Sequence, residues 1–175
     1  MSDLMNVIKE RRSIRKFKSD VVPKEIIDKI IEAGVFAASG RGKQAPIVIA
    51  VTNKEFRDKI VEENRKIGGW DEGFDPFYGA PVILVVASPK DIPTSVYDGS
   101  LTLGNMMLEA HDLGLGTCWI HRAREEFENG FGDEILAKAG ISGDYIGVGH
   151  LALGYIDGEN PDIIPRKEDR VFYID

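Results

Sequence analysis

The segment from about Thr94 to Leu113 constrains the fold of this chain more than any other. Its pattern predicts one long helix that is ended by Gly114 and Gly116, because glycine is unfavourable inside helices. Apolar or small side chains occur on most sides of this helix, at Leu101, Leu103, Met106, Met107, Leu108, Ala110 and Leu113. A helix of this kind must be buried in a core or at an interface between subunits.

The remaining elements follow from the periodicity of apolar residues. Helical spacing predicts helices over about 3–11, 23–34, 54–66 and 125–139. Short apolar runs rich in β-branched residues predict strands over 47–51, 81–87, 117–120 and 146–155. Alternation in the last strand predicts one face formed by Ile146, Val148, His150 and Ala152. The apolar run Val171 to Ile174 is strand-like, and we expect it to pair with a partner subunit.

Composition excludes several classes of protein. A chain of 175 residues with 43% hydrophobic residues suits a single domain over 1–175. A net charge of -7 disfavours binding to nucleic acid or to anionic membranes. Cys118 is the single cysteine, so an internal disulfide or a cysteine-held cluster is excluded, and redox chemistry would need an organic cofactor. Charged residues interrupt the N-terminal segment, and we expect a cytoplasmic protein.

Two short basic stretches lie near opposite ends of the chain, Arg11 to Arg15 and Arg166-Lys167. A tight site for a phosphate monoester needs several cationic donors and a hydroxyl, because the ligand carries nearly two negative charges. Arg11, Ser13 and Arg15 meet this demand. An alternative interpretation is that the first two arginines complete the C-terminus of a helix, where positive charge is favourable.

Several familiar catalytic motifs are absent. Gly114 and Gly116 follow a helix, whereas a dinucleotide fingerprint places its glycines between a strand and a helix. The loop 40–44 lacks the Gly-Lys-Ser/Thr ending of a phosphate loop. The histidines are too widely spaced to suggest metal ligands, at His111, His121 and His150. Cys118 lies within an apolar strand, where a free cysteine usually packs as a small hydrophobe, so we assign it no catalytic role.

A series of short segments follows one order along the chain. They are Arg11-Arg12-Ser13-Ile14-Arg15, Ala37 to Pro46, Phe77-Tyr78-Gly79-Ala80-Pro81, Gly114 to Ile120, Leu153-Gly154-Tyr155 and Pro165-Arg166-Lys167. This order resembles the nitroreductase family of FMN-dependent oxidoreductases, and the resemblance covers nearly all residues from 4 to 172.

The resemblance implies an α+β fold with a central mixed, mostly antiparallel sheet flanked by helices, in an intertwined homodimer that binds FMN at the subunit interface. By the family pattern, the FMN phosphate would be held by Arg11, Arg12, Ser13, Arg15, Arg166 and Lys167. Gly42 and Gln44 match positions that contact the flavin ring or ribityl chain from the other subunit. The stretch beside the flavin ring, where a backbone amide can bind flavin N5, corresponds to Cys118, Trp119, Ile120 and His121. For Trp119, a place in the core is an equally good interpretation.

The resemblance further implies a ping-pong transfer of two electrons from NADH or NADPH through FMN to a nitroaromatic, a quinone or a similar small acceptor. This chain departs from the commonest family pattern at Gly42, where asparagine is frequent, and at Ala45-Pro46, where proline and tryptophan are frequent. Two alternatives therefore stay open. One is an enzyme of the same fold with different chemistry, such as reductive dehalogenation or flavin fragmentation. The other is a protein that binds or stores FMN without turnover.

Overall fold

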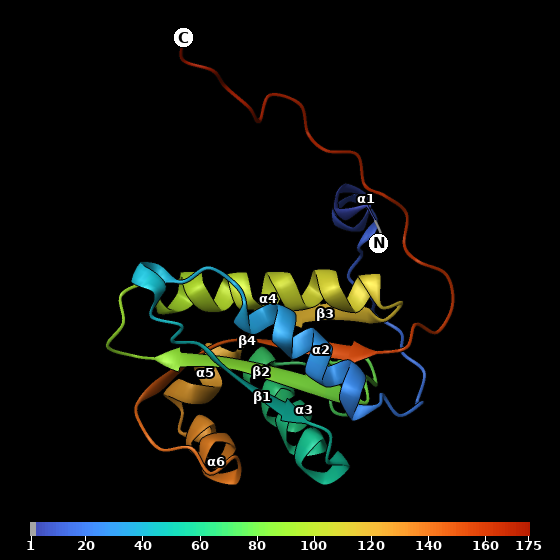
Figure 1. Ribbon diagram of the computed structural model, residues 1–175. Coiled ribbons are helices and arrows are strands. Elements are labelled where there is room, and N and C mark those ends of the chain that lie inside the picture. The colour runs from blue at the N-terminus through green and yellow to red at the C-terminus, as the bar shows by residue number, and fades with distance from the viewer. Residues whose placement is uncertain (1–2) are drawn as a thin grey trace.

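A four-stranded antiparallel sheet forms the centre of the computed structural model, which describes residues 3–175 (Figure 1). The strand order is β1-β2-β4-β3, with β1 at Ile47–Val51, β2 at Val82–Pro89, β3 at Gly116–Ile120 and β4 at Tyr145–Gly154. The helices of these residues are α1 Leu4–Glu10, α2 Lys24–Val35, α3 Lys54–Gly68, α4 Ser95–Asp112, α5 Ala123–Glu128 and α6 Phe131–Lys138. The predicted α+β fold is thus confirmed. Its parallel component is confined to one bridge, between Ser13 and Thr117.

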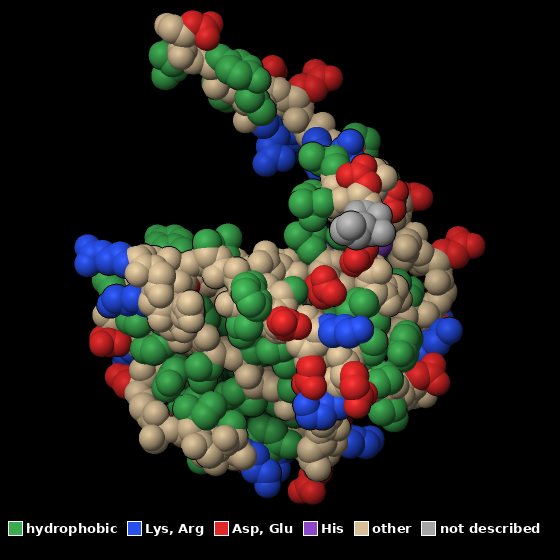
Figure 2. Space-filling model, viewed as in Figure 1, with side chains coloured by type: hydrophobic (Ala, Val, Ile, Leu, Met, Phe, Trp, Pro, Cys, Tyr) green, Lys and Arg blue, Asp and Glu red, His purple; other side chains and the backbone are tan. Residues whose placement is uncertain are grey.

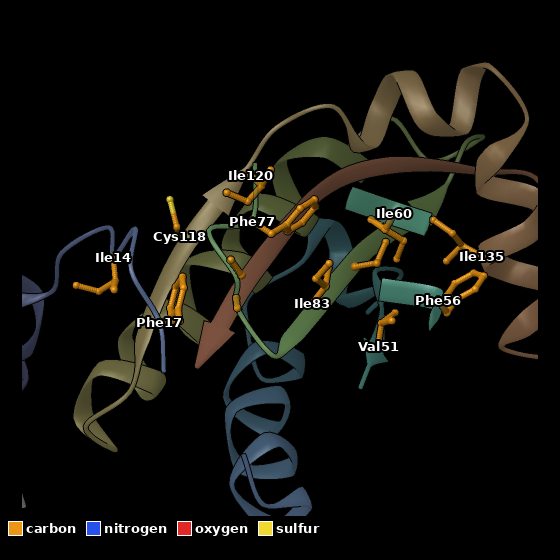
Figure 3. Packing of buried hydrophobic residues seen from close by; sticks show 13 residues of the cluster. Ile14, Phe17, Val51, Phe56, Ile60, Phe77, Ile83, Cys118, Ile120 and Ile135 are labelled. Atoms are coloured by element: carbon orange, nitrogen blue, oxygen red, sulfur yellow. The ribbon is translucent and has the colours of Figure 1, made fainter. Parts of the chain in front are cut away.

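Helices cover both faces of this sheet. Figure 1 shows α2 and α4 on one face and α3, α5 and α6 on the other. Each face has its own cluster of buried hydrophobic side chains, and Figure 3 shows the one beneath α3 and α6, with Ile60, Phe77 and Ile135. The central strand β2 is almost fully buried from Val82 to Ala87, because both of its faces are covered. This explains its continuous run of apolar residues.

The long helix α4 is buried on one side only. Leu103, Met106 and Ala110 are fully buried against the sheet and α2. Gly34 of α2 permits this close contact, because a Cβ there would lie 2.6 Å from Cγ of Met106. On its other side α4 leaves Tyr97 72% exposed. The burial that the sequence predicts for this helix is therefore incomplete within one chain.

The segment predicted as one helix over 125–139 forms two helices, so that prediction is wrong in this detail. α5 ends at Glu128, and Gly130 then adopts a left-handed φ of 95° before α6 begins at Phe131. The Asn129 side chain accepts a hydrogen bond from the Phe131 N–H at 3.0 Å. The break turns α6 back under the sheet, where Ile135 reaches the core.

The predicted alternation of side chains along β4 is interrupted by a β-bulge. β2 residues Val86 and Ala87 pair with Gly149 and Gly147, so Val148 is an extra residue on β4. Val148 packs in the cluster beneath α2 and α4, whereas Ala152 lies in the opposite cluster. The expectation that these two residues share a face is therefore wrong, and the bulge is the reason.

The chain leaves the compact body after β4. Figures 1 and 2 show the C-terminal segment extending away from the body past α1. It forms no strand in this structure, and Val171, Phe172, Tyr173 and Ile174 are all at least 70% exposed. The strand-like pattern of this segment is therefore unpaired within one chain. Between residues 3 and 175, no helix is both long enough and apolar enough to cross a membrane.

Candidate functional site

A cleft of about 280 Å³ gathers most of the predicted phosphate-binding residues. It is lined by Arg11, Arg12, Ser13, Arg15, Pro161, Asp162, Ile164 and Arg166. The segment after α1 is held against the start of β3, because the Ile14 N–H donates to the Thr117 carbonyl at 2.9 Å. The cleft thus lies where the N-terminal segment, β3 and the C-terminal segment meet.

The charges in this cleft suit an anion. Burial and the neighbouring Arg12 lower the pKa of Arg11, and Arg166 lowers it further. Three guanidinium nitrogens are buried without a hydrogen-bond partner among the described residues, namely Nη1 of Arg11 and both Nε and Nη2 of Arg12. Buried donors without acceptors are costly, and a phosphate offers the oxygens and the negative charge that this group lacks. Asp162 is the one carboxylate in the lining.

The two interpretations of the first basic stretch apply to different atoms. Nη1 of Arg12 donates to the carbonyls of Lys9 and Arg11, both at 2.7 Å, and so completes the C-terminus of α1. The other nitrogens of Arg12, with Arg11, Ser13 and Arg15, remain available in the cleft. Lys167 is exposed and does not line the cleft, so the structure separates it from its neighbour Arg166.

The loop that carries Gly42 and Gln44 is fixed by an aspartate that the sequence analysis missed. Asp98, 4% exposed on α4, accepts from the Gly40 N–H at 3.0 Å and from the Thr94 hydroxyl at 2.8 Å. Gln44 has a left-handed φ of 50°, and its N–H donates to the Ser39 hydroxyl at 2.9 Å. A cavity of about 490 Å³ lies beside this loop. A carboxylate in the first turn of a helix rich in apolar residues was the available signal.

This loop and the basic cleft lie at opposite ends of α4. Gly40 contacts Thr94 and Asp98 at the N-terminal end, whereas Thr117, which holds the segment beside the cleft, follows the C-terminal end. The 18 residues of α4 span about 27 Å at a rise of roughly 1.5 Å per residue. Within one chain, the two groups are therefore separated by about the length of α4.

The strand β3 runs from the cleft along the edge of the sheet to the turn at His121. Cys118 and Ile120 are buried in the cluster beneath α3, and Trp119 is half-buried on the α4 side, close to Gly149. Burial raises the pKa of the Cys118 thiol, although Arg15 and Arg11 act in the opposite direction. The thiol is therefore protonated at neutral pH. His121 is exposed, and it is the first residue after the strand.

The chain makes a sharp turn after His121. Arg122 has a left-handed φ of 83°, and α5 begins at the next residue. The His121 carbonyl accepts a hydrogen bond from the Asn64 side chain at 2.8 Å. Asn64 belongs to a buried polar group with Glu126 and His150 that the sequence analysis missed, because His150 was interpreted only as a core or surface histidine.

Comparison with known proteins agrees with this arrangement. A family model described as the nitroreductase family matches residues 8–155, most of the chain and all four strands. The chain belongs to the nitroreductase family. This nitroreductase-family chain is 36% identical over 126 residues to an NADH dehydrogenase/NAD(P)H nitroreductase of Methanothermobacter thermautotrophicus. That match covers 67% of this chain and 60% of the relative, so the chain spans less than two thirds of the relative's length.

Solved structures share the whole fold of this nitroreductase-family chain. A nitroreductase of Bacteroides fragilis, determined with bound FMN, superposes with a TM-score of 0.91 over 100% of both chains at 23% identity. An iodotyrosine deiodinase, determined with FMN and 3-iodo-L-tyrosine, superposes with a TM-score of 0.79 over 98% of this chain and 99% of the other at 23% identity. At these identities the likeness establishes the fold.

Proposed function

We propose that this chain is an FMN-dependent oxidoreductase, which transfers two electrons from NADH or NADPH to a small oxidised acceptor such as a nitroaromatic or a quinone. The observation that carries the proposal is the basic cleft, where buried guanidinium donors lack partners at the start of β3. Membership of the nitroreductase family and the FMN found in the Bacteroides fragilis structure support it.

The residues of the cleft fit the phosphate of FMN. Arg11, Arg15 and Arg166 would supply paired N–H donors, and the Ser13 hydroxyl would add a neutral one. FMN, when bound, supplies the two-electron chemistry at its N5 atom. The chain itself binds and orients the cofactor and limits the access of water.

The turn after β3 supplies a backbone donor for the flavin ring. A trans peptide directs its C=O and N–H in opposite directions, and no described peptide is cis. Because the His121 carbonyl faces Asn64 in the interior, the Arg122 N–H faces away from the interior. We therefore extend the predicted flavin-side stretch, Cys118 to His121, by one residue and assign the N5 donor to Arg122.

The site requires a homodimer in this proposal. If α4 helices of two subunits pack antiparallel, the Gly40–Gln44 loop of one subunit approaches the basic cleft of the other. The outer side of α4, with Val96, Tyr97 and Leu101, offers the apolar surface for that contact. The unpaired C-terminal segment Val171–Ile174 would then pack on the partner. Nicotinamide and acceptor would occupy one pocket in turn, as a ping-pong scheme needs.

The first experiment separates binding from turnover. The purified protein is titrated with FMN, and the complex is mixed anaerobically with NADH or NADPH in a stopped-flow spectrometer. A panel of acceptors follows, comprising a nitroaromatic, a quinone and an iodinated phenol, because an iodotyrosine deiodinase has the same fold. Reduction by a nucleotide and reoxidation by the first two acceptors support the proposal. Deiodination alone would indicate dehalogenase chemistry, and bound FMN that neither nucleotide reduces would indicate a storage protein.

Replacing one cation tests the cleft. Arg15→Ala removes a paired donor to the phosphate, so we expect FMN affinity to fall about 10-fold to 100-fold, measured by quenching of flavin fluorescence. Lys18→Ala is the matched control, because Lys18 is an exposed cation three residues further on that lies outside the cleft. Equal affinities for the two variants would contradict the assigned contact.

A further inference from the structure

A buried polar chain connects three elements beneath the turn after β3. Asn64 of α3, Glu126 of α5 and His150 of β4 are each 0% exposed. His150 Nε2 lies 2.7 Å from Glu126 Oε2, and the other carboxylate oxygen, Oε1, accepts from Asn64 Nδ2 at 2.7 Å. Asn64 Nδ2 also donates to the His121 carbonyl at 2.8 Å. The chain of contacts thus ends on the backbone of the turn.

The His121 carbonyl has no other hydrogen-bond partner among the described residues. The pairing of β3 with β4 ends at Ile120, opposite His150. In α5 the first accepting carbonyl belongs to Arg122, which receives the Glu126 N–H at 3.0 Å. His121 lies between these two regular elements, so only the Asn64 side chain fixes the orientation of its carbonyl.

The Asn64 amide is itself held in one orientation. Its two N–H groups face two acceptors, the Glu126 carboxylate and the His121 carbonyl. A flipped amide would set its own oxygen against both, which is repulsive at these distances. His150 holds Glu126 from the other side, and Phe77 packs against the His150 ring at 5.6 Å between centroids.

The backbone of β4 is adapted to this arrangement. A Cβ at Gly147 would collide with the carbonyl of Ala123, the first residue of α5. The absence of a side chain at Gly147 lets the start of α5 rest directly on β4. This close contact brings Glu126 within hydrogen-bond distance of His150. Three buried polar groups cost more than apolar ones would, and here they form one chain of contacts in which Asn64 binds the His121 carbonyl.

We propose that Asn64, Glu126 and His150 are positioning residues that hold the peptide between His121 and Arg122 in the orientation that presents the Arg122 N–H to the flavin. The inference rests on the proposed function, since it assumes that FMN lies beside this turn. It goes beyond that function by assigning control of the N5 donor to residues that touch neither cofactor nor substrate.

The decisive variant is Asn64→Asp, which keeps the shape of the side chain but replaces a donor with an acceptor. The carboxylate would repel the His121 carbonyl and release the peptide. We expect FMN binding to weaken about 5-fold to 10-fold, and the absorption band and the midpoint potential of the bound flavin to shift. Asn53→Asp is the matched control, because Asn53 caps the same helix by accepting from the Phe56 N–H, which an aspartate also does.

A second pair of variants tests the middle of the chain of contacts. Glu126→Gln retains an acceptor for Asn64 and, with the other tautomer of His150, a hydrogen bond to the ring, so FMN affinity and spectrum should stay within about 2-fold of wild type. Glu126→Leu removes both contacts and should reproduce the effect of Asn64→Asp. Circular dichroism and thermal unfolding of the apoproteins test whether each variant is folded. If Asn64→Asp does not fold, Asn64→Ser, which adds no charge, replaces it.

The outcomes distinguish this inference from the proposed function. If the wild-type protein fails to bind FMN, the proposed function fails. If wild type binds FMN and a folded Asn64 variant binds it with the same affinity, spectrum and potential, the positioning role is wrong while the proposed function stands. A Glu126→Gln variant that behaves like Glu126→Leu would also overturn the positioning role.

Discussion

Cys118 lies where the apolar core meets the basic cleft. Its side chain is 4% exposed and packs in the cluster beneath α3, while Ser13, Arg11 and Arg15 lie close enough to influence the thiol. Burial is the largest influence and raises the pKa of the thiol. The sulfur therefore behaves as a small hydrophobe despite its cationic neighbours, and reactivity should depend on unfolding rather than on the nearby charge.

We expect Cys118 to react slowly with a thiol reagent such as Ellman's reagent in the native protein and rapidly in urea. The raised pKa also makes stability depend on pH. The folded state keeps the thiol proton more tightly, so its contribution is complete below 9.0, the ordinary pKa of the group, and is lost as the pH rises through the folded pKa. Urea unfolding at pH 8 and pH 10 should show a larger loss for wild type than for Cys118→Ala. Equal losses would contradict this expectation.

At the scale of elements, the loop between α3 and β2 is held by one half-buried ion pair. Asp75 accepts from the N–H groups of Phe77 at 2.7 Å and Gly79 at 2.9 Å, and its carboxylate pairs with Arg57 at 2.7 Å. Arg57, with a side chain 12% exposed, is thereby linked to two turns of the loop. These bonds offset the left-handed φ of 57° at Tyr78.

Asp75→Ala should lower the free energy of unfolding by about 1–3 kcal/mol, because it removes one of the two carboxylates paired with Arg57 and frees two backbone donors. Urea denaturation followed by circular dichroism measures the effect. Asp71→Ala in the same loop is the control, since its exposed side chain makes no hydrogen bond or ion pair in the structure, and its effect should stay within about 0.5 kcal/mol. Similar losses for both variants would show that the loop does not depend on Asp75.

The sequence predicted elements better than it predicted contacts. Periodicity located all four strands and the long helix, because burial on one face or both leaves a repeating pattern. It missed the break at Gly130 and the bulge at Val148, since a single glycine or an extra residue changes no pattern by itself. It placed Arg11 and Arg166 in one cluster through the resemblance, yet it missed Asp98 and Glu126, whose partners are distant in sequence.

At the scale of the whole molecule, the outer side of α4 and the C-terminal segment are apolar surfaces that one chain leaves uncovered. Leu101 is 50% exposed, and Phe172 is 81% exposed. Such surfaces are typical of chains that associate. In the proposed site, one FMN contacts both the Gly40–Gln44 loop and the basic cleft, which lie at opposite ends of α4 within one chain. This separation also favours a site built from two chains.

Leu101→Asp should therefore convert the proposed dimer to a monomer and abolish tight FMN binding. Wild type should elute with light scattering near twice the chain mass of 19.4 kDa, and the variant near that mass. Because Leu101 is half exposed in one chain, the fold of the monomer should persist by circular dichroism. Lys138→Asp on α6, on the opposite side of the sheet, should leave the mass unchanged. A dimeric Leu101→Asp protein would contradict the assigned interface.

The extra residue in β4 determines which neighbours its side chains can reach. Gly147 and His150 both face α5, although they are three positions apart, and an odd spacing sends two residues to opposite faces of a regular strand. Without the bulge, strict alternation at this spacing would keep only one of the two on that face. The space that Gly147 leaves for α5 and the contact of His150 with Glu126 therefore both depend on the bulge. We expect the bulge, the glycine and the histidine to occur together in related chains.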